Sequence, residues 1–475
     1  MKKFYITTAI PYVNANPHIG FTLELVQADV IARYHRQLGD STYFLTGTDD
    51  NALKNVQAAE AAGVDTKEFV DKNADKFIEL TKRINISNDY FIRTATDKHF
   101  QGAQKLWSAC KKEDVYKKKY KGHYCVGCEA FYMEKDLVDG KCPEHKKELE
   151  VVEEENYFFK LSNYQKKLEK LIESDTYKVI PESRKNEILS FIRMGLEDFS
   201  ISRSRDRAKN WGVPVPGDDT QIMYVWFDAL SNYITALDYE NEGELYKKFW
   251  PADTHVIGKG IIRFHAAYWP AMLMSAGIPL PKKLFVHGYI NIKGDKMSKS
   301  LGNVVNPFEL LDKYGVDAVR YYLLKHVHPV QDSDFSYDKF DISYNADLAN
   351  GLGNLVARVS NLLEKNELEV DIKIDSDKSL IKEFKVKINK YKFNSALELL
   401  WGKLRSADET LSAKAPWKMD DKKAIKGVLE PIAQDILNVA ELLKPFMPET
   451  SEKIIKQFSA KQIKKEEGLF PRIVG

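Results

Sequence analysis

Long apolar runs are missing from this sequence of 475 residues. No stretch reaches the roughly 20 consecutive apolar residues that a membrane-spanning helix needs, so no transmembrane span is predicted. The first residues, MKKFYITTAIPYV, lack the apolar block and the cleavage site of a secretory signal, and they read as a strand of the fold. We therefore expect a cytoplasmic protein.

A strong charge of either sign is also missing, because the formal net charge is +2. Any surface that binds nucleic acid must therefore be local. Hydrophobic residues make up 44% of the chain and charged residues 29%, as in ordinary globular proteins. The chain is too long for a single core, and about two to four domains are expected.

Cysteine is scarce, and three of the four cysteines are clustered. Cys125 and Cys128 are separated by two residues, and so are Cys142 and His145. Three thiolates and an imidazole at this spacing suit a closed, tetrahedral, structural zinc site better than disulfides or a chance spacing of free thiols. Cys110 lies outside the pattern and is expected to be a packed helix residue.

The start of the chain has a βαβ pattern. Residues 4–10 and 41–45 are prone to form strands, and residues 22–38 have helical periodicity between them. The intervening turn carries His18 and Gly20, and a helix N-terminus at this position is able to hold an anion. Taken alone, however, the H-x-G pattern is weak, and a buried structural histidine is the simpler interpretation.

Acidic residues follow the second predicted strand, in the sequence TGTDDN at residues 46–51. They lie at a carboxyl edge, where ligands bind in open parallel sheets. The alternative is that Asp49 or Asp50 caps a helix over residues 52–62. Two more amphipathic helices are predicted over residues 66–84 and 97–114.

A cluster of arginines, ISRSRDR at residues 201–207, either holds RNA phosphate or ties domains together. The loop at residues 211–217 is a candidate boundary. A strand and glycine turn at residues 255–260 then resume the α/β pattern. An insertion between two halves of one sheet explains this order most simply.

Two lysines stand three residues apart in HGYINIKGDKMSKSLGN, residues 287–303. Lys296 and Lys299 suit a polyanion such as a nucleotide triphosphate, whereas a solvated lysine loop is the alternative. A helix is expected to start at Pro307. From about residue 341 helical periodicity dominates, which predicts a helix bundle.

The fold class predicted is α/β, with a Rossmann-like parallel-sheet catalytic domain, a zinc-knuckle insertion and an all-α helix bundle. The predicted ranges are residues 1–115 and 221–340 for the two halves of the catalytic domain, 116–220 for the insertion, and 341–475 for the bundle.

Three motifs now stand in one order: PHIG at a first βα turn, a Cys3His knuckle, and KMSKS before a helical C-terminal region. Together they resemble the methionyl-tRNA synthetase family of class I aminoacyl-tRNA synthetases, over essentially the whole chain. The resemblance implies ligation of L-methionine to tRNA(Met) through a methionyl-adenylate, with release of AMP and diphosphate. It also implies that the bundle reads the anticodon.

The resemblance implies a role for individual residues. His18, Lys296 and Lys299 would be catalytic. The residues that would bind ATP are Pro11, Asn14, His18, Gly20, Phe21, His287, Lys296, Met297, Ser298, Lys299 and Ser300. Those that would bind methionine are Ile10, Tyr12, Asp49, Trp226, Ala229, Tyr233 and His265. The residues that would hold one structural Zn²⁺ are Cys125, Cys128, Cys142 and His145. Those that would bind the anticodon are Asn354, Arg358 and Trp417.

Physical chemistry agrees with these roles. Asp49 would pair with the substrate ammonium, and a thioether gains from contact with aromatic rings. Lysines and a histidine, with Mg²⁺ bound to ATP, would stabilise charge on the phosphates. Unpaired bases stack on aromatic residues such as Trp417. The alternatives are a packing residue at Trp417 and a surface salt bridge at Arg358.

The expected partners are tRNA(Met), ATP and L-methionine, without membrane or DNA. A monomer is expected because the C-terminal dimerising extension of some relatives is not seen. Class I enzymes for other amino acids fit less well, because the interruption here is too short for a large editing insertion.

Four positions, in three segments, depart from the family pattern. Phe21 replaces a second histidine, Asn51 and Ala52 replace a histidine and a glycine, and Gly260 replaces an aspartate. The alternative function is therefore a catalytically impaired tRNA-binding paralogue. Activity is favoured, because the other expected site residues remain.

Overall fold

The computed structural model describes residues 1–125, 130–132, 134, 137–143, 146–292, 294–296, 304–374 and 377–473. The chain forms two compact units. The first unit comprises Met1–Pro17, Gly39–Lys82 and Ser87–His287, and the second comprises His18–Leu38, Arg83–Ile86 and Gly288–Gly475.

A six-stranded parallel sheet forms the centre of the first unit, in the order β3-β2-β1-β12-β13-β7. Its strands are β1 (Lys3–Thr8), β2 (Ser41–Thr48), β3 (Tyr90–Arg93), β7 (Lys178–Ile180), β12 (Thr254–Gly258) and β13 (Lys283–His287). β1 is buried along nearly its whole length, as expected for a strand covered on both faces. Because β12 pairs directly with β1, the sheet combines early and late parts of the chain, as predicted.

The chain between these parts forms two antiparallel sheets. One has the order β5-β4-β6-β8 and is dominated by the long pairing of β4 (Val115–Cys125) with β6 (Glu150–Phe159). The other has the order β10-β11-β9. The remaining strands are β5 (Ala130–Tyr132), β8 (Phe199–Ser200), β9 (Ser202–Ser204), β10 (Pro214–Val215) and β11 (Asp218–Met223). β7 also lies in the range predicted as an insertion, yet it joins the parallel sheet beside β13. The predicted domain boundaries stay a prediction.

Helices surround the sheets of the first unit. They are α2 (Leu53–Ala62), α3 (Thr66–Arg83), α4 (Asp97–Ala109), α5 (Gln165–Glu173), α6 (Glu182–Arg193), α7 (Val225–Thr235), α8 (Glu244–Phe249) and α9 (Trp269–Ser275). Short helical turns are η1 (Lys112–Asp114), η3 (Leu161–Tyr164), η4 (Tyr239–Asn241), η5 (Lys259–Ile261) and η6 (Phe264–Tyr268). α4 ends at Ala109, earlier than predicted, and Cys110 follows it as a buried cap residue. Cys110 is packed as predicted, but it lies just beyond α4 with extended backbone rather than within a helix.

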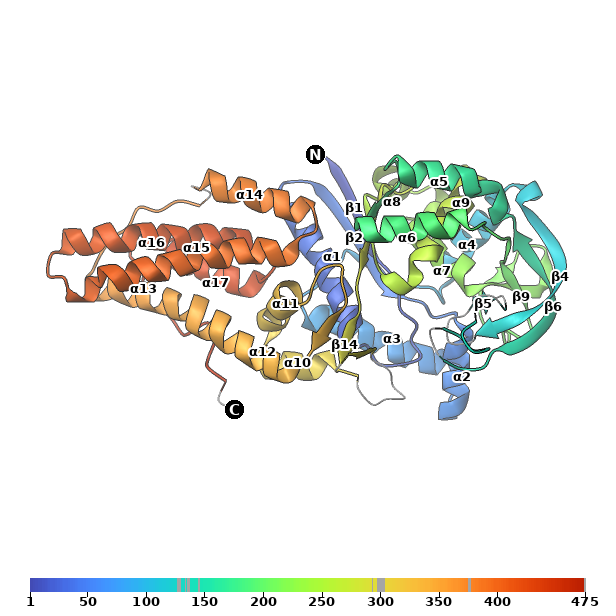
Figure 1. Ribbon diagram of the computed structural model, residues 1–475, viewed down its shortest axis with the longest axis horizontal. Helices are drawn as coiled ribbons and strands as arrows, with labels where there is room; N and C mark the ends of the chain where they lie inside the picture. The colour runs from blue at the N-terminus through green and yellow to red at the C-terminus, as the bar shows by residue number, and fades with distance from the viewer. Residues whose placement is uncertain are drawn as a thin grey trace. The chain divides into compact units, whose positions relative to one another are not determined.

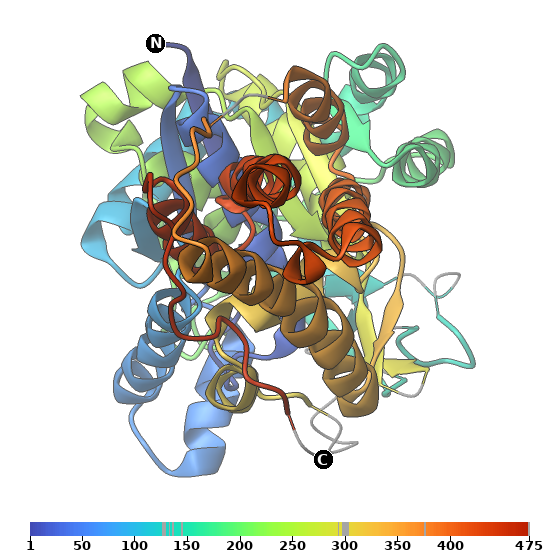
Figure 2. The same ribbon diagram turned by 90° about the vertical axis from the view of Figure 1, so that its left-hand side faces the viewer.

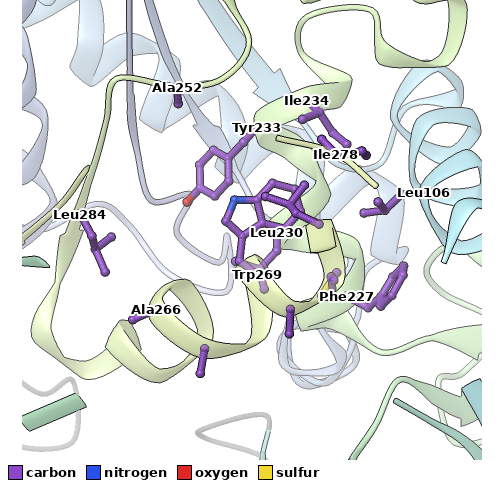
Figure 3. Packing of buried hydrophobic residues seen from close by; sticks show 14 of the residues in the cluster. Leu106, Phe227, Leu230, Tyr233, Ile234, Ala252, Ala266, Trp269, Ile278 and Leu284 are labelled. Atoms are coloured by element: carbon purple, nitrogen blue, oxygen red, sulfur yellow. The ribbon is translucent and has the colours of Figure 1, made fainter. Parts of the chain in front are cut away.

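The hydrophobic core of this unit centres on α7 and α9. Figure 3 shows Leu230 and Tyr233 of α7 beside Trp269 of α9, with Leu106 of α4 nearby. The Trp269 side chain is fully buried, and its ring lies 6.0 Å from that of Tyr233. Burial of a large aromatic side chain contributes on the order of 2–3 kcal/mol. This packing fixes α7, the helix that carries several predicted site residues.

A buried ion pair holds helix α1 (Ile19–Gln37) to helix α11 (Val316–Lys325) in the second unit. Asp29 and Arg320 lie 2.7 Å apart with both side chains fully buried. Arg320 also donates hydrogen bonds to the carbonyl oxygens of Pro445 and Phe446. A buried charge is tolerated only with such partners. α1 begins three residues earlier than predicted, because His18 caps it.

The rest of the second unit begins with β14 (Ile290–Ile292), β15 (Asp295–Lys296), β16 (Ser333–Phe335) and helix α10 (Pro307–Tyr314), whose start at Pro307 is as predicted. It continues with α12 (Tyr337–Ser343), η8 (Tyr344–Gly353), α13 (Asn354–Lys365), α14 (Lys378–Asn389), α15 (Phe393–Lys414), η9 (Pro416–Lys418), α16 (Lys422–Leu443) and α17 (Pro448–Phe458). Figure 1 shows α13, α15 and α16 running alongside one another, and Figure 2 looks nearly along the axes of α15 and α16. The predicted helical C-terminal region is confirmed. No helix in the described part of the chain is long and apolar enough to span a bilayer.

Candidate functional site

The predicted methionine-binding residues all belong to the first unit. Those outside α7 come from segments that follow strands of its parallel sheet, whereas α7 follows β11 of the antiparallel sheet. Tyr12 follows β1 and forms an isolated parallel bridge with Asp49, which follows β2. His265 follows β12 in η6, and Trp226, Ala229 and Tyr233 lie on α7. Parallel strands end at one edge of a sheet, which is where open α/β sheets bind ligands.

Asp49 is held in place by its neighbours. Its backbone N–H donates to the Pro11 carbonyl at 2.8 Å, and its own carbonyl accepts from the side chain of Asn55 at 3.0 Å. Its Oδ1 accepts from the backbone N–H of Asn51 at 3.2 Å. The side chain is buried, with 2% exposed. A carboxylate fixed in this way is suited to an ammonium group.

The alternative role for these acidic residues, capping α2, is wrong. α2 begins after Ala52, which makes no side-chain cap hydrogen bond. Asp50 instead accepts from the guanidinium of Arg93 at 2.9 Å, and burial raises its pKa while Arg93 opposes that shift.

Aromatic side chains form a wall beside Asp49. Trp226 stacks on Phe264 of η6 with ring centroids 3.7 Å apart and an interplanar angle of 3°. Its ring also meets His265 edge-on at 6.3 Å. Tyr12 and Trp226 both pack on the small buried cluster of Ala52, Tyr224 and Val225. Such a wall suits an apolar, polarisable side chain such as a thioether.

Hydrogen bonds fix the tautomer of His265. Its Nδ1 lies 2.9 Å from the Ile261 carbonyl and must donate to it, so Nε2 accepts from the Tyr233 hydroxyl at 2.7 Å. Burial lowers the pKa of His265 to about 4, although the hydrogen bond to Ile261 opposes that shift. The imidazole is therefore neutral at physiological pH. The π-helical turn of η6 is a feature that often marks functional sites.

Sequence reasoning gave no role to His99 or Asp228, and it recognised Asn51 only as a departure from the family pattern. His99 Nε2 lies 2.5 Å from Asp228 Oδ1, and Asn51 donates to Asp228 Oδ2 at 2.8 Å. All three are at least nine-tenths buried. The sequence signals were the departure at Asn51 and the position of Asp228 among the predicted pocket residues of α7.

The predicted ATP-binding residues are divided between the two units. Pro11, Asn14 and His287 belong to the first, whereas His18, Gly20 and Phe21 belong to the second. His18 is exposed, so the interpretation as a buried histidine is wrong. Its Nδ1 accepts from the Gly20 backbone N–H at 3.0 Å and caps α1.

The predicted lysine loop is largely outside the described residues. These omit Met297, Ser298, Lys299 and Ser300, and only the backbone of Lys296 is described, in β15. The roles of both lysines stay predictions.

Two of the four predicted zinc ligands are described. The thiols of Cys125 and Cys142 are buried and in no disulfide. The carbonyl of Cys142 accepts from the Lys146 N–H at 2.8 Å. Cys128 and His145 lie outside the described residues, and within the described ones no group of three or more ligands is arranged to hold a metal. The described donors, two buried thiols, fit zinc.

The arginine cluster connects strands within the first unit. The Arg203 guanidinium lies 4.3 Å from the Tyr224 ring and donates to the Ser202 carbonyl at 2.9 Å. Arg207 donates to Glu150 at 2.9 Å. The contacts of both arginines lie within the first unit.

The predicted anticodon residues lie together in the second unit. The Arg358 guanidinium carbon is 5.4 Å from the Trp417 ring, and Arg358 donates to Asp408 at 2.7 Å. Asn354 is exposed, and 47% of Trp417 is exposed. The interpretation of Trp417 as a packing residue is therefore wrong, whereas the surface salt bridge of Arg358 is present. An exposed indole beside a guanidinium is suited to stacking on bases.

The family model described as "tRNA synthetases class I (M)" matches residues 4–150 and 145–360. The chain is 42% identical to a methionine--tRNA ligase of Clostridium acetobutylicum, an alignment that covers 99% of this chain and 78% of that protein. It is 40% identical to a methionine--tRNA ligase of Brucella melitensis, over 98% of this chain and 93% of that protein.

The chain belongs to the class I methionyl-tRNA synthetase family. A solved structure supports this membership in three dimensions: the methionyl-tRNA synthetase of Mycobacterium tuberculosis in complex with methionyl-adenylate. It aligns with a TM-score of 0.94 and 38% identity, over 99% of this chain and all of that one. The apo form of the same enzyme aligns with a TM-score of 0.85 over the whole of this chain. The predicted family and fold class are confirmed, apart from the zinc knuckle, which lies partly outside the described residues.

Proposed function

We propose that this chain ligates L-methionine to tRNA(Met) in two steps, first forming methionyl-adenylate and diphosphate from methionine and ATP, and then releasing AMP. As a member of this family it is a methionine--tRNA ligase. The observation that best supports the substrate is the buried Asp49 carboxylate beside the wall of Trp226 and the neutral pair Tyr233–His265. This arrangement matches an amino acid with an ammonium at one end and a thioether at the other.

Each pocket residue has a distinct task in the proposal. Asp49 pairs with the substrate ammonium and orients the carboxylate toward the α-phosphate. Tyr12, Trp226 and His265 enclose the side chain, and Ile10, Ala229 and Tyr233 complete the surface around it. Attack of the carboxylate on the α-phosphate needs alignment and charge stabilisation more than proton transfer.

The ATP end of the site is assigned from the family resemblance. Pro11, Asn14, His18, Gly20, Phe21 and His287 would bind ATP together with the loop from Lys296 to Ser300. Lys296 and Lys299 would stabilise the diphosphate as it leaves. Mg²⁺ bound with ATP would neutralise phosphate charge. His18 is exposed at the N-terminus of α1, where backbone N–H groups favour an anion.

Zinc and the anticodon complete the proposal. Cys125, Cys128, Cys142 and His145 would hold one structural Zn²⁺, which metal analysis would detect as about one equivalent per chain. Asn354, Arg358 and Trp417 would bind the anticodon. A cytoplasmic monomer remains the expectation.

Charging of tRNA tests the function as a whole. The purified chain, ATP and radiolabelled methionine should produce methionyl-tRNA from a tRNA(Met) transcript with a CAU anticodon, and much less from a transcript with an altered anticodon. Tight binding of tRNA(Met) without charging would instead support the impaired paralogue.

A further inference from the structure

A chain of buried polar side chains connects the carboxylate of Asp49 with helix α7. Asn51 donates through its backbone N–H to Asp49 and through its side chain to Asp228. The other oxygen of Asp228 meets His99 Nε2 at 2.5 Å, and the His99 and Asp228 side chains are each 1% exposed. Asp49 and Asp228 therefore share one intermediary, the residue Asn51.

The orientation of the Asn51 amide is fixed by its partners. Its Nδ2 lies 3.1 Å from the Thr94 carbonyl and 2.8 Å from Asp228 Oδ2, and both of these atoms are acceptors. Only the NH2 group satisfies both. A flipped amide would place an oxygen against two oxygens, so the link is directional.

Close packing of α4 against α7 brings His99 of α4 within hydrogen-bond distance of Asp228. A Cβ added at Gly102 of α4 would lie 2.3 Å from the Cγ2 of Thr235 on α7. Glycine therefore permits the approach of the two helices. His99, three residues before Gly102, meets Thr235 Oγ1 through its Nδ1 at 2.8 Å and Asp228 through its other nitrogen. The imidazole thus joins α4 to α7 at two points.

The position of Asp228 on α7 connects these hydrogen bonds with the predicted methionine pocket. Asp228 stands on α7 between Trp226 and Ala229, so a change in how it is held moves both. A buried carboxylate that loses one of its hydrogen-bond donors is strongly destabilised. The hydrogen bonds of Asp228 to Asn51 and His99 therefore stay formed in the folded protein.

We propose that Asn51, Asp228 and His99 are positioning residues that set the separation between the ammonium-binding carboxylate and the aromatic wall, and so select the length of the amino-acid side chain. The inference rests on the proposed function, since it assumes that methionine binds between Asp49 and Trp226. It also assigns a role to Asn51, one of the departures from the family pattern. A histidine at this position is also able to donate to Asp228.

Variants at Asn51 test the proposal in ATP–diphosphate exchange. Asn51→Leu removes both side-chain hydrogen bonds, and the KM for methionine is expected to rise about tenfold while the KM for ATP stays unchanged. The preference for methionine over its S-ethyl homologue, ethionine, is expected to fall. Asn51→His is expected to restore most of the methionine KM and of the preference. Asp228→Asn, which places an NH2 group against one of the two donors, is expected to resemble Asn51→Leu.

Asn156→Leu is the matched control. Asn156 is fully buried and donates to a carboxylate oxygen of Glu154 at 3.2 Å, and its Oδ1, like that of Asn51, has no hydrogen-bond partner among the described residues. It lies on β6, outside the proposed pocket. This variant is expected to lower the unfolding temperature without changing either KM or the preference.

The outcomes separate the two proposals. Methionine-dependent exchange by the wild-type chain measures the proposed function, whereas differences among variants measure the positioning role. An unchanged methionine KM in Asn51→Leu, an equal rise in the KM for ATP, or an Asn51→His variant as impaired as Asn51→Leu would each overturn the positioning role and leave the ligase function standing.

Discussion

The pocket around Asp49 and the exposed cluster of Asn354, Arg358 and Trp417 differ in how their side chains are held. In the pocket, both ring nitrogens of His265 are hydrogen-bonded, and the ring is 1% exposed. In the exposed cluster, Trp417 is 47% exposed, and Arg358 is held by a partly exposed ion pair with Asp408.

This difference matches the ligands proposed for each region. A small amino acid must be distinguished by the shape of its site, which favours side chains fixed before binding. Unpaired RNA bases are flexible, and they bind to surface side chains that give up a contact within the protein for a contact with the base. An exposed ion pair contributes only about 0–1 kcal/mol, so Arg358 is able to leave Asp408 at little cost. Substitutions in the pocket should therefore have larger effects than substitutions in the exposed cluster.

The largest effect is expected for Asp49→Asn. The variant keeps the shape of the side chain but removes the charge that pairs with the substrate ammonium. Loss of one partner of a buried charge pair costs about 2–5 kcal/mol, so kcat/KM for methionine in diphosphate exchange should fall on the order of a hundredfold or more. The KM for ATP should change little. A fall of less than about threefold would mean that Asp49 does not bind the ammonium.

A smaller effect is expected for Tyr233→Phe. The variant leaves His265 Nε2 buried without its donor, which costs about 1–3 kcal/mol and should lower kcat/KM for methionine about tenfold. Tyr164→Phe is the matched control, because its hydroxyl is hydrogen-bonded to buried Asp114 on another part of the first unit. The control should lose stability and keep its methionine kinetics. Equal kinetic losses in both variants would show a general structural effect.

Trp417→Ala should affect only the reaction with tRNA. Stacking of a base on an aromatic side chain contributes about 1–3 kcal/mol, so kcat/KM for tRNA(Met) should fall about tenfold. Diphosphate exchange, which needs no tRNA, should not change. Tyr337→Ala, which removes another exposed aromatic residue of the second unit (41% exposed), should alter neither reaction. If diphosphate exchange fell as much as tRNA charging in Trp417→Ala, Trp417 would not act on the tRNA reaction alone.

The smallest effect concerns pH. The pKa of His265 is about 4 in the folded protein, below its ordinary value of 6.5, so the unfolded chain takes up the proton first as pH falls. The folded state therefore loses stability between pH 6.5 and 4, by about 1 kcal/mol at pH 5.5. His265→Gln should show a weaker dependence of the unfolding midpoint on pH in this window. The buried His255, whose pKa is also lowered, should retain part of the slope. Parallel curves for the two proteins would exclude this role of His265.

Helices and strands whose hydrophobic residues recur with a clear period could be predicted from the sequence. α3 begins at Thr66 as predicted and ends at Arg83, and the two halves of the parallel sheet were recognised because strand and glycine-turn signals resume near residue 255. β7 was missed, because three residues carry no period and only the pairing with β13 makes them a strand.

Only those residues of the candidate site that belong to recognised motifs could be predicted from the sequence. Asp49, Trp226 and His265 were assigned from the family resemblance, but some of the residues around them come from distant parts of the chain. His99 and Asp228 are 129 residues apart, and no local pattern connects them. Asn51 was recognised only as a departure, since its hydrogen bonds need Thr94 at the end of β3 and Asp228 on α7, both far from Asn51 in the sequence.

Exchange of diphosphate into ATP, measured separately with each of the twenty amino acids, tests the central claim most directly. The wild-type chain should catalyse exchange with methionine and show little or none with the other amino acids. Highest exchange with a different amino acid, or no exchange with any of them in a preparation that still binds tRNA(Met), would contradict it.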